Sequence, residues 1–115
     1  SPFRVVYGLR NIQLRVGVNL LGRVPDAVIR IDSVWVSRRH AQIVVEPDSA
    51  TIEDLDSTNG TFVNGKQVSE PVDLSDGDTI YLGRLADALY FRGAGPHAST
   101  APIVERTPLA PLLDS

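Results

Sequence analysis

Polar side chains of complementary chemistry gather in a few short segments of this sequence. A Ser-Arg-Arg-His run occupies positions 37–40, and a longer run, Asp-Ser-Thr-Asn-Gly-Thr-Phe-Val-Asn-Gly, occupies positions 56–65. Gly22 and Arg23 precede these runs, and Asp-Gly-Asp follows them at 76–78. Among these side chains are two guanidinium groups, two hydroxyls and an Asn amide that together form a set of donors suited to a tetrahedral oxyanion. Binding such an anion requires neither a metal nor a nucleophile.

The elements that must position these side chains are predicted to be β-strands. Between residues 1 and 92, apolar and often β-branched residues come in short bursts that are separated by turn residues at close intervals. This pattern is typical of a sandwich or a barrel, and no stretch in this range reads as a good helix. We predict strands at 3–7, 12–16, 19–22, 28–31, 41–46, 51–54, 62–63, 67–68, 72–74, 79–82 and 88–91.

Local patterns add detail to the predicted strands and turns. Ile12, Leu14 and Val16 alternate with polar residues, which predicts one buried face and one wet face. Asn-Gly at 59–60 and 64–65 and Asp-Gly at 76–77 supply the positive φ angles that tight hairpins need. Pro-Asp-Ser at 47–49 predicts another hairpin turn. The polar runs therefore fall in loops at the ends of strands.

Size and composition limit the classes of protein to be considered. The chain has 115 residues, enough for one domain. Composition changes near Gly93: the segment 93–115 holds four of the eight prolines and no aromatic residue. We expect residues 1–92 to form the domain and residues 93–115 a flexible Pro- and Ala-rich tail or linker. Because Met is absent even at position 1, we expect the chain to be a piece of a longer protein, the alternative being a processed N-terminus.

Charge and cysteine content argue against several functions. The net charge is −3, whereas a nucleic-acid-binding domain is expected to be strongly basic. No apolar run approaches the roughly 20 residues of a membrane span, and no signal-peptide pattern is visible. The absence of cysteine excludes disulfides and Cys-ligated metals and fits a reducing compartment. We therefore expect a cytoplasmic domain that binds neither nucleic acid nor membrane.

The polar segments closely resemble the motifs of the forkhead-associated (FHA) domain. The matching residues are Gly22-Arg23, Ser37 to His40, Ser57 to Thr61, Asn64-Gly65, Asp76 to Asp78 and Leu82-Gly83. The resemblance covers roughly residues 3–92 and is most specific between Gly22 and Gly83, where several motifs occur in the right order and spacing. It implies an all-β, FHA-like sandwich of about eleven strands, of the SMAD/FHA type. It also implies phosphothreonine-dependent binding of peptides by loops at one end, as in bacterial signalling and regulatory proteins.

The same resemblance assigns roles to individual residues. The residues that it places in the phosphopeptide site are Arg23, Ser37, Arg38, Thr58 and Asn59. It makes His40 and Gly22 supports of the site, since His40 would hold a loop from behind and Gly22 would allow close backbone packing. We also expect Gly60 and Asn64 to support the site, and Asn64 could instead meet a residue further along the peptide.

The chemistry of these side chains fits the implied roles. A phosphothreonine carries about 1.5 to 2 negative charges and three strong acceptor oxygens. Arg23 and Arg38 can donate charge-assisted hydrogen bonds to these oxygens, whereas Ser37 and Thr58 offer short neutral donors. An Asn amide such as Asn59 can hold a peptide main chain, because it both donates and accepts. Arg39 would point away from Arg38 in an extended segment, so we expect Arg39 to be solvated or to steer the ligand.

Catalysis is a weaker reading of the same residues. Ser37 and His40 lie three residues apart, but the sequence contains no Gly-x-Ser-x-Gly nucleophile elbow. The other histidine, His97, lies in the predicted tail. No Walker motif or dinucleotide fingerprint occurs, and the Asp-Gly-Asp run is not a full calcium loop. We expect neither enzymatic activity nor a cofactor, and the principal alternative is a phospho-independent interaction or self-association sandwich.

For several residues near the polar segments, the sequence allows two interpretations. Trp35, the only tryptophan, either packs on the sandwich edge or forms an apolar lip beside the peptide. The aspartates near the basic loops either pair with the arginines or are solvated; they are Asp26, Asp32, Asp54 and Asp56. Thr100 and Thr107 lie in the predicted tail, and once phosphorylated they could occupy the site of the same or a neighbouring domain.

Overall fold

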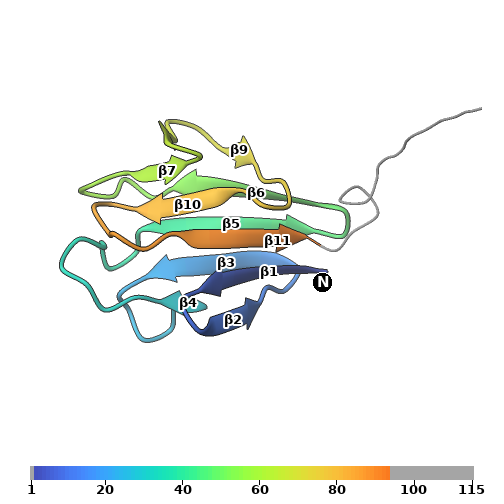
Figure 1. The fold of residues 1–115 in the computed structure, drawn as a ribbon, viewed down its shortest axis with the longest axis horizontal. Helices are drawn as coiled ribbons and strands as arrows, with labels where there is room; N and C mark the ends of the chain where they lie inside the picture. The colour runs from blue at the N-terminus through green and yellow to red at the C-terminus, as the bar shows by residue number, and fades with distance from the viewer. Residues whose placement is uncertain (1, 94–115) are drawn as a thin grey trace, which may run out of the picture.

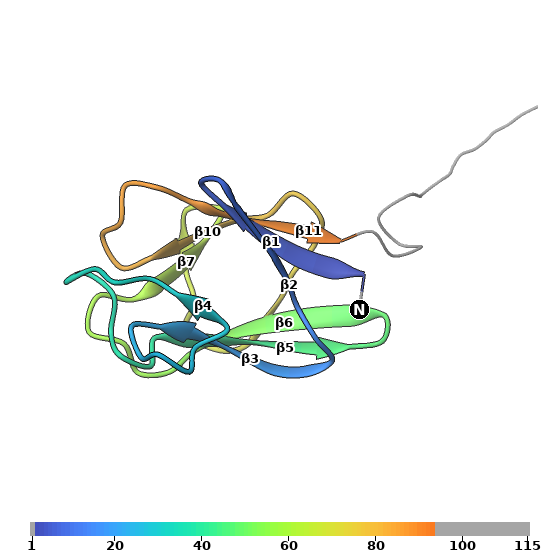
Figure 2. The same cartoon turned by 90° about the horizontal axis from the view of Figure 1, so that it is seen from below.

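Two β-sheets face each other in the computed structural model, which describes residues 2–93 (Figures 1 and 2). The first sheet has the order β2 (Arg10–Gln13), β1 (Phe3–Tyr7), β11 (Leu89–Gly93), β10 (Thr79–Leu82), β7 (Thr61–Val63) and β8 (Lys66–Gln67). The second has the order β4 (Ile29–Arg30), β3 (Gly17–Gly22), β5 (Ala41–Glu46), β6 (Ser49–Asp54) and β9 (Val72–Asp73). The described residues thus form eleven strands, and the predicted all-β sandwich is confirmed.

The core lies between the two sheets and follows the two-residue period of the strands. In β5, Ala41, Ile43 and Val45 are buried, and the residues between them face outward. The first sheet contributes residues such as Ile80 and Phe91, and the Phe91 ring stacks on Phe3 at 5.4 Å between centroids. Each fully buried large apolar side chain stabilises the fold by about 1.5–3 kcal/mol. This core fixes the frame on which the polar loops are mounted.

Strand register brings three distant segments of the chain together at one end of the second sheet. Leu21 of β3 pairs with Ala41 of β5, which in turn pairs with Asp54 of β6. The residues that follow or precede these pairs therefore lie on neighbouring strand ends. Figure 1 shows the loops after β3, β4, β6 and β10 gathered at the left end of the sandwich, whereas the N-terminus and the end of β11 lie at the right.

The second predicted strand is shifted and its alternation ends early. The structure places β2 at Arg10–Gln13 instead of 12–16, and Val16 is 59% exposed although Leu14 is buried. The buried Asn19 side chain accepts a hydrogen bond from Arg15 N and donates to Arg15 O, and Gly17 has a φ of 105°. These contacts turn the chain as it crosses between the sheets. The predicted burial of Val16 is therefore wrong.

Two of the four predicted hairpins are present. Asn64 and Gly65 have φ angles of 52° and 84° and join β7 to β8, and Pro47-Asp48 joins β5 to β6. Gly60 and Gly77 also have positive φ angles, 88° and 90°, as their motifs predict. Their loops, however, connect β6 to β7 and β9 to β10, which belong to different sheets. The hairpin predictions at these two glycines are therefore wrong.

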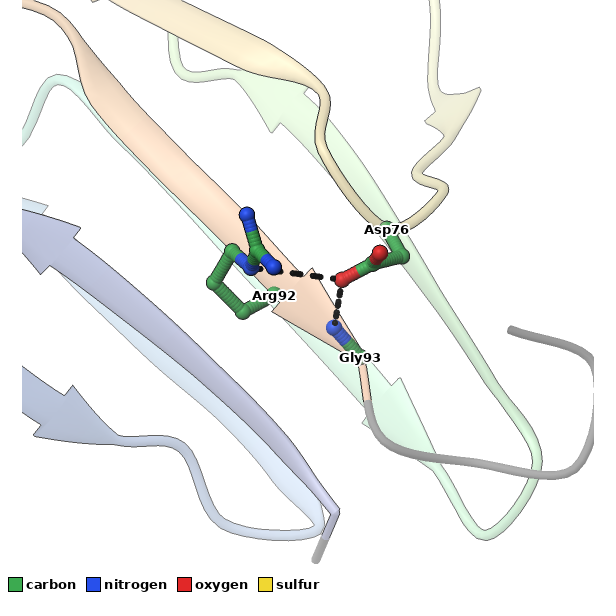
Figure 3. A network of polar contacts seen from close by, with 3 residues as sticks. All are labelled: Asp76, Arg92 and Gly93. Carbon is green, nitrogen blue, oxygen red and sulfur yellow. Dashed lines mark hydrogen bonds and ion pairs between the residues drawn. The ribbon is translucent and has the colours of Figure 1, made fainter. Parts of the chain in front are cut away.

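The end of β11 is fastened to the loop that precedes β10 (Figure 3). The Asp76 carboxylate accepts a hydrogen bond from Gly93 N at 3.0 Å and lies 3.4 Å from Arg92 Nε. The last strand thus extends to Gly93, one residue beyond the predicted domain. The rest of the predicted tail, including Thr100 and Thr107, lies outside the described residues.

Candidate functional site

The junction of β3 with the loop before β5 depends on a glycine. A Cβ atom at Gly22 would lie 2.1 Å from the Arg38 carbonyl oxygen. Arg23 N donates hydrogen bonds to Ser37 O at 3.2 Å and Arg38 O at 2.9 Å, and Val24 N also donates to Arg38 O at 3.2 Å. The absence of a side chain at Gly22 lets the backbone at 37–38 lie directly against the end of β3, as the sequence predicts.

The Arg23 side chain is oriented by a main-chain acceptor. Its Nε donates a hydrogen bond of 2.6 Å to Val36 O, and the residue is half-buried. Within residues 2–93 the ion pair found joins Arg92 to Asp76, so no carboxylate neutralises Arg23 or Arg38. The two guanidinium groups at the loop end of the sandwich are therefore not engaged in ion pairs within residues 2–93.

Ser37 connects the two loops that carry the predicted donors. Its Oγ accepts a hydrogen bond from Thr58 N at 3.0 Å, which leaves the Ser37 hydroxyl proton available to a ligand. Asn59 makes a parallel link, since its Nδ2 donates to Trp35 O at 3.1 Å. Residues 35–38 and 58–59 are thus held against each other although about 20 residues separate them in the chain.

His40 lies behind these loops and is fully buried. Its Nδ1 accepts a hydrogen bond from Ser37 N at 3.0 Å, and its Nε2 lies 2.7 Å from Gly60 O. Because Nδ1 must accept, the proton lies on Nε2 and the ring is neutral. Burial lowers the pKa of His40 below its ordinary value of 6.5, although the Gly60 contact and the charge of Asp54 act in the opposite direction.

Asp54 organises the loop between β6 and β7. Its carboxylate accepts hydrogen bonds from Ser57 N at 3.0 Å, Ser57 Oγ at 2.5 Å and Thr61 Oγ1 at 2.6 Å. Burial raises the pKa of Asp54, but these hydrogen bonds outweigh it and hold the pKa below its usual range. Asp54 therefore neither pairs with an arginine nor is merely solvated. The spacing of an Asp three residues before a Ser is the signal that could have identified it.

Gly60 and Gly83 allow the remaining loops to approach. Gly60 N donates to Ser57 Oγ at 2.9 Å, and Gly83 N donates to Gly60 O at 2.7 Å. A Cβ at Gly83 would lie 2.2 Å from Trp35 O. Gly83, part of the Leu82-Gly83 motif, is thus a structural residue of the site.

Trp35 lies at the rim with its side chain partly free. It is 42% exposed, and the Arg84 guanidinium carbon lies 5.0 Å from the centroid of its ring. The neighbouring Val34 is 84% exposed. A cation–π contact of this kind contributes about 0.5–1 kcal/mol at an exposed position. Trp35 thus lies at the rim beside Arg84, and its role as an apolar lip for a peptide stays a prediction.

The five predicted ligand-contacting residues line one cavity of about 300 Å³. Its wall consists of Arg23, Val34, Val36, Ser37, Arg38, Thr58 and Asn59. Arg39 is exposed and does not line this cavity. The cavity thus combines two cations, two hydroxyls and an amide, and its open side faces solvent.

Asn64 lies away from this cavity. Its Nδ2 donates to Asp78 Oδ1 and its Oδ1 accepts from Thr79 N, both at 3.0 Å. Thr79 begins β10, whereas the site lies beyond the other end of that strand, at Gly83. The geometry gives Asn64 a role in the β7–β8 hairpin instead of a contact with the cavity.

The arrangement suits anion binding and not nucleophilic attack. A nucleophilic serine needs a base that accepts its hydroxyl proton. The His40 Nδ1 instead accepts the backbone N–H of Ser37, and its other nitrogen is occupied by Gly60 O. In the part of the chain that the structure describes, no cluster of metal-ligating side chains is present. None of the secondary structure in residues 2–93 is helical, and hence no membrane-spanning helix occurs there.

Known proteins with similar sequences and structures carry the same domain. FhaA of Mycobacterium tuberculosis, an FHA domain-containing protein, is 49% identical over 74 residues, which are 64% of this chain and 14% of FhaA. The crystal structure of the FhaA FHA domain complexed with the intracellular domain of Rv3910 superimposes with a TM-score of 0.72 at 39% identity, covering 78% of this chain and 99% of that domain. This chain therefore corresponds to a small part of its longer relative.

A second solved relative is EmbR of Mycobacterium tuberculosis in complex with a low-affinity phosphopeptide. It superimposes with a TM-score of 0.74 at 30% identity, over 82% of this chain and 25% of EmbR. These findings bear out the predicted class, because similar domains have been solved with a protein partner in FhaA and with a phosphopeptide in EmbR. The sequence model of the FHA domain matches residues 19–83, more than half of the chain. The chain belongs to the FHA domain family.

Proposed function

We propose that this chain is a phosphothreonine-dependent binding module that recruits a phosphorylated protein segment to its loop end. The observation that carries the proposal is the single cavity that brings together Arg23, Ser37, Arg38, Thr58 and Asn59. Its arginines form no ion pair within residues 2–93, so their charge is available to a phosphate. FHA relatives solved with a phosphopeptide or a protein partner support the assignment.

Each lining residue has a role that its contacts allow. Arg23 is held at Nε by Val36 O, which leaves its terminal nitrogens for the phosphate oxygens. Arg38 adds a second, more exposed guanidinium. Ser37 and Thr58 donate hydroxyl hydrogen bonds that orient the phosphate, and Asn59 uses its remaining amide capacity for the peptide main chain. The fixed geometry reduces the entropy lost on binding.

The module acts by binding alone in this proposal. Its neutral, doubly hydrogen-bonded histidine provides no general base, and the established family is one of binding domains. A signalling or regulatory setting agrees with the longer FHA relatives. The cytoplasmic location and the absence of nucleic-acid binding stay predictions.

The proposal is tested with an oriented array of phosphothreonine peptides beside an identical unphosphorylated array. We expect a subset of phosphorylated peptides to bind and their unphosphorylated copies not to bind. Binding of both copies with equal affinity would instead favour the phospho-independent interaction that the sequence left open. The array also reports which residues the module prefers around the phosphothreonine.

A further inference from the structure

A second cavity lies beside the phosphopeptide cavity. It has a volume of about 220 Å³, and its wall consists of Arg23, Val24, Pro25, Arg30, Asp32 and Arg38. It shares Arg23 and Arg38 with the first cavity, but it contains none of the hydroxyl or amide donors at Ser37, Thr58 and Asn59. The two shared arginines therefore form a wall between two adjacent hollows.

Two hydrogen bonds hold Arg30 at this cavity, one made by its side chain and one by its backbone carbonyl. It is the last residue of β4 and pairs with Gly22 of β3. Its Nε donates to Arg23 O at 2.9 Å, and its own carbonyl oxygen accepts from the Arg10 guanidinium at 2.8 Å. These contacts use one nitrogen of the Arg30 guanidinium and leave its two terminal groups without a hydrogen-bond partner in residues 2–93.

The cavity carries an excess of positive charge. Three guanidinium groups line it, and Asp32 is the one carboxylate in the wall. None of these arginines forms an ion pair with a carboxylate in the described part of the chain. The charged lining does not suit an apolar ligand, and its three arginines would repel a cationic one. An anion with several acceptor oxygens matches three guanidinium groups best.

We propose that the cavity at Arg30 is a second anion subsite, which takes a second phosphoryl group on the same partner segment. This inference rests on the proposed function, because the first phosphothreonine anchors the segment. An extended peptide advances about 3.3–3.6 Å per residue, so a second phosphate a few residues away can cross the shared arginine wall. The module then prefers doubly phosphorylated segments of one particular spacing.

The test compares synthetic peptides by calorimetric titration against the full chain. One peptide carries a single phosphothreonine, and a series adds a second phosphothreonine at each nearby position before or after it. We expect one spacing to bind at least about tenfold more tightly than the singly phosphorylated peptide, the effect of one or more charge-assisted hydrogen bonds. An aspartate at that position should give a smaller gain, which distinguishes a phosphoryl group from a carboxylate.

Two variants assign the gain to this cavity. The readout is the ratio of the singly to the doubly phosphorylated dissociation constant, which cancels general effects on the first site. Arg30→Gln should bring the ratio close to one, whereas Asp32→Asn should raise it by removing the opposing charge. Arg39→Gln, a change of an exposed arginine outside both cavities, should leave the ratio as in the wild type. Thermal unfolding of each variant confirms that it is folded.

The possible failures are distinguishable. If the singly phosphorylated peptide binds but every second phosphate gives the same small gain in the wild type and in Arg30→Gln, the second subsite does not exist. If Arg30→Gln retains the full spacing-dependent gain, the second phosphate lies elsewhere. If no phosphothreonine peptide binds at all, the proposed function itself fails and the subsite with it.

Discussion

Arg23 is the residue on which the phosphate contact depends most. Its Nε bond to Val36 O fixes the guanidinium at the wall between two cavities, and no carboxylate in the described chain competes for it. Its half-buried position strengthens a charge-assisted hydrogen bond relative to one in open solvent. A solvated arginine such as Arg39 has neither advantage.

Replacement of Arg23 by Gln should nearly abolish phosphopeptide binding. Loss of one partner from a hydrogen-bonded charge pair costs about 2–5 kcal/mol, which raises the dissociation constant at least about thirtyfold. Titration calorimetry with one phosphothreonine peptide measures the effect. Arg39→Gln is the matched control and should weaken binding by less than about fivefold, since Arg39 is exposed, lies outside the cavity and acts on the ligand only through screened charge. Equal losses in the two variants would contradict the site.

His40 should make the stability of the domain depend on pH. Because burial lowers its pKa in the folded state, the unfolded state binds more protons below the ordinary value of 6.5. The stability from the neutral ring is thus complete above pH 6.5 and is lost as the pH falls below it. Urea unfolding should show this slope in the wild type and a smaller slope in His40→Asn.

Asp54 should make the stability depend on pH in a separate, lower pH range. Its folded pKa is also lowered, so its contribution is complete above its ordinary value of 3.8 and is lost only as the pH falls below that value. Asp54→Asn should therefore keep the slope near pH 6 that the wild type shows. If His40→Asn and the wild type had the same slope near pH 6, the assignment of His40 as a buried, neutral ring would be contradicted.

The sequence identified most of the polar residues but not how they support one another. Arg23, Ser37 and Thr58 were predicted from their motifs, and all three line one cavity. The role of Gly83 was missed because it depends on the approach of Trp35, which is far away in the sequence. Asp54 bonds within its own loop, to Ser57 and Thr61, and its spacing to Ser57 could have identified it. Hydrogen-bonding capacity is visible in a sequence, whereas the choice of partner is set by strand register.

At the scale of elements, the register of β3, β5 and β6 determines the site. Leu21, Ala41 and Asp54 lie side by side on these strands. The loop before Ala41 therefore lies against Gly22 through its residues 37–38, and the loop after Asp54 bonds it through Thr58. A shift by one residue would turn every side chain of a strand to the other face of the sheet. The alignment of the loops is therefore a consequence of the packed core.

Replacement of Gly22 by Ala should both destabilise the domain and impair binding. The new Cβ would lie 2.1 Å from Arg38 O, so the backbone at 37–38 must move. Overpacking of this kind costs about 1–3 kcal/mol. The free energy of unfolding in urea and the affinity for a phosphothreonine peptide should fall together.

Gly8→Ala is the matched control for that change. Gly8 has a φ of 60°, but a Cβ there meets no atom within 4 Å. The left-handed conformation costs a residue with a side chain roughly 1–2 kcal/mol, so stability should fall to a similar degree. Peptide affinity should nevertheless be retained. A loss of affinity in Gly8→Ala equal to that in Gly22→Ala would show that binding follows stability and not the loop contact.

The strands themselves were predicted better than their connections. Short β-branched bursts such as 41–46 and 79–82 were placed correctly, because alternation and burial reinforce each other there. The loops at Gly60 and Gly77 have the predicted positive φ angles, yet they cross between sheets. A turn motif specifies local backbone angles, but it does not say which sheet the next strand joins.

At the scale of the whole molecule, the sandwich separates the binding loops from the chain ends. The loops lie at one end in Figure 1, and the N-terminus and the end of β11 lie at the other. Asp76 fastens Gly93 at that distant end (Figure 3). A ligand at the loop end can thus be held without disturbing whatever precedes or follows the domain.

Charge is distributed unevenly over this molecule. The net charge is −3, but arginines line the two cavities at the loop end. A third hollow, which shares no residue with these two, is lined by Glu53, Asp54, Asp56 and Glu70 among others. The positive field is consequently local, and it acts on a ligand only at short range in salt.

Binding should therefore weaken as salt is added, mainly because the association rate falls. Screening reduces the attraction between exposed charges, whereas hydrogen bonds already formed in the cavity are affected less. Stopped-flow fluorescence of Trp35 with a phosphothreonine peptide measures both rates. We expect the association rate to fall with salt more than the dissociation rate rises. An association rate that is independent of salt would contradict the local basic field.

The most direct test of the central claim is a nuclear magnetic resonance titration of the labelled chain with a phosphothreonine peptide and with its unphosphorylated copy. The structure predicts that the phosphorylated peptide shifts the amide signals of Arg23, Ser37, Thr58 and Asn59 together, and that the unphosphorylated copy leaves them in place. Equal shifts with both peptides would contradict it. So would shifts confined to the outer face of the second sheet, where Val18 is 58% exposed.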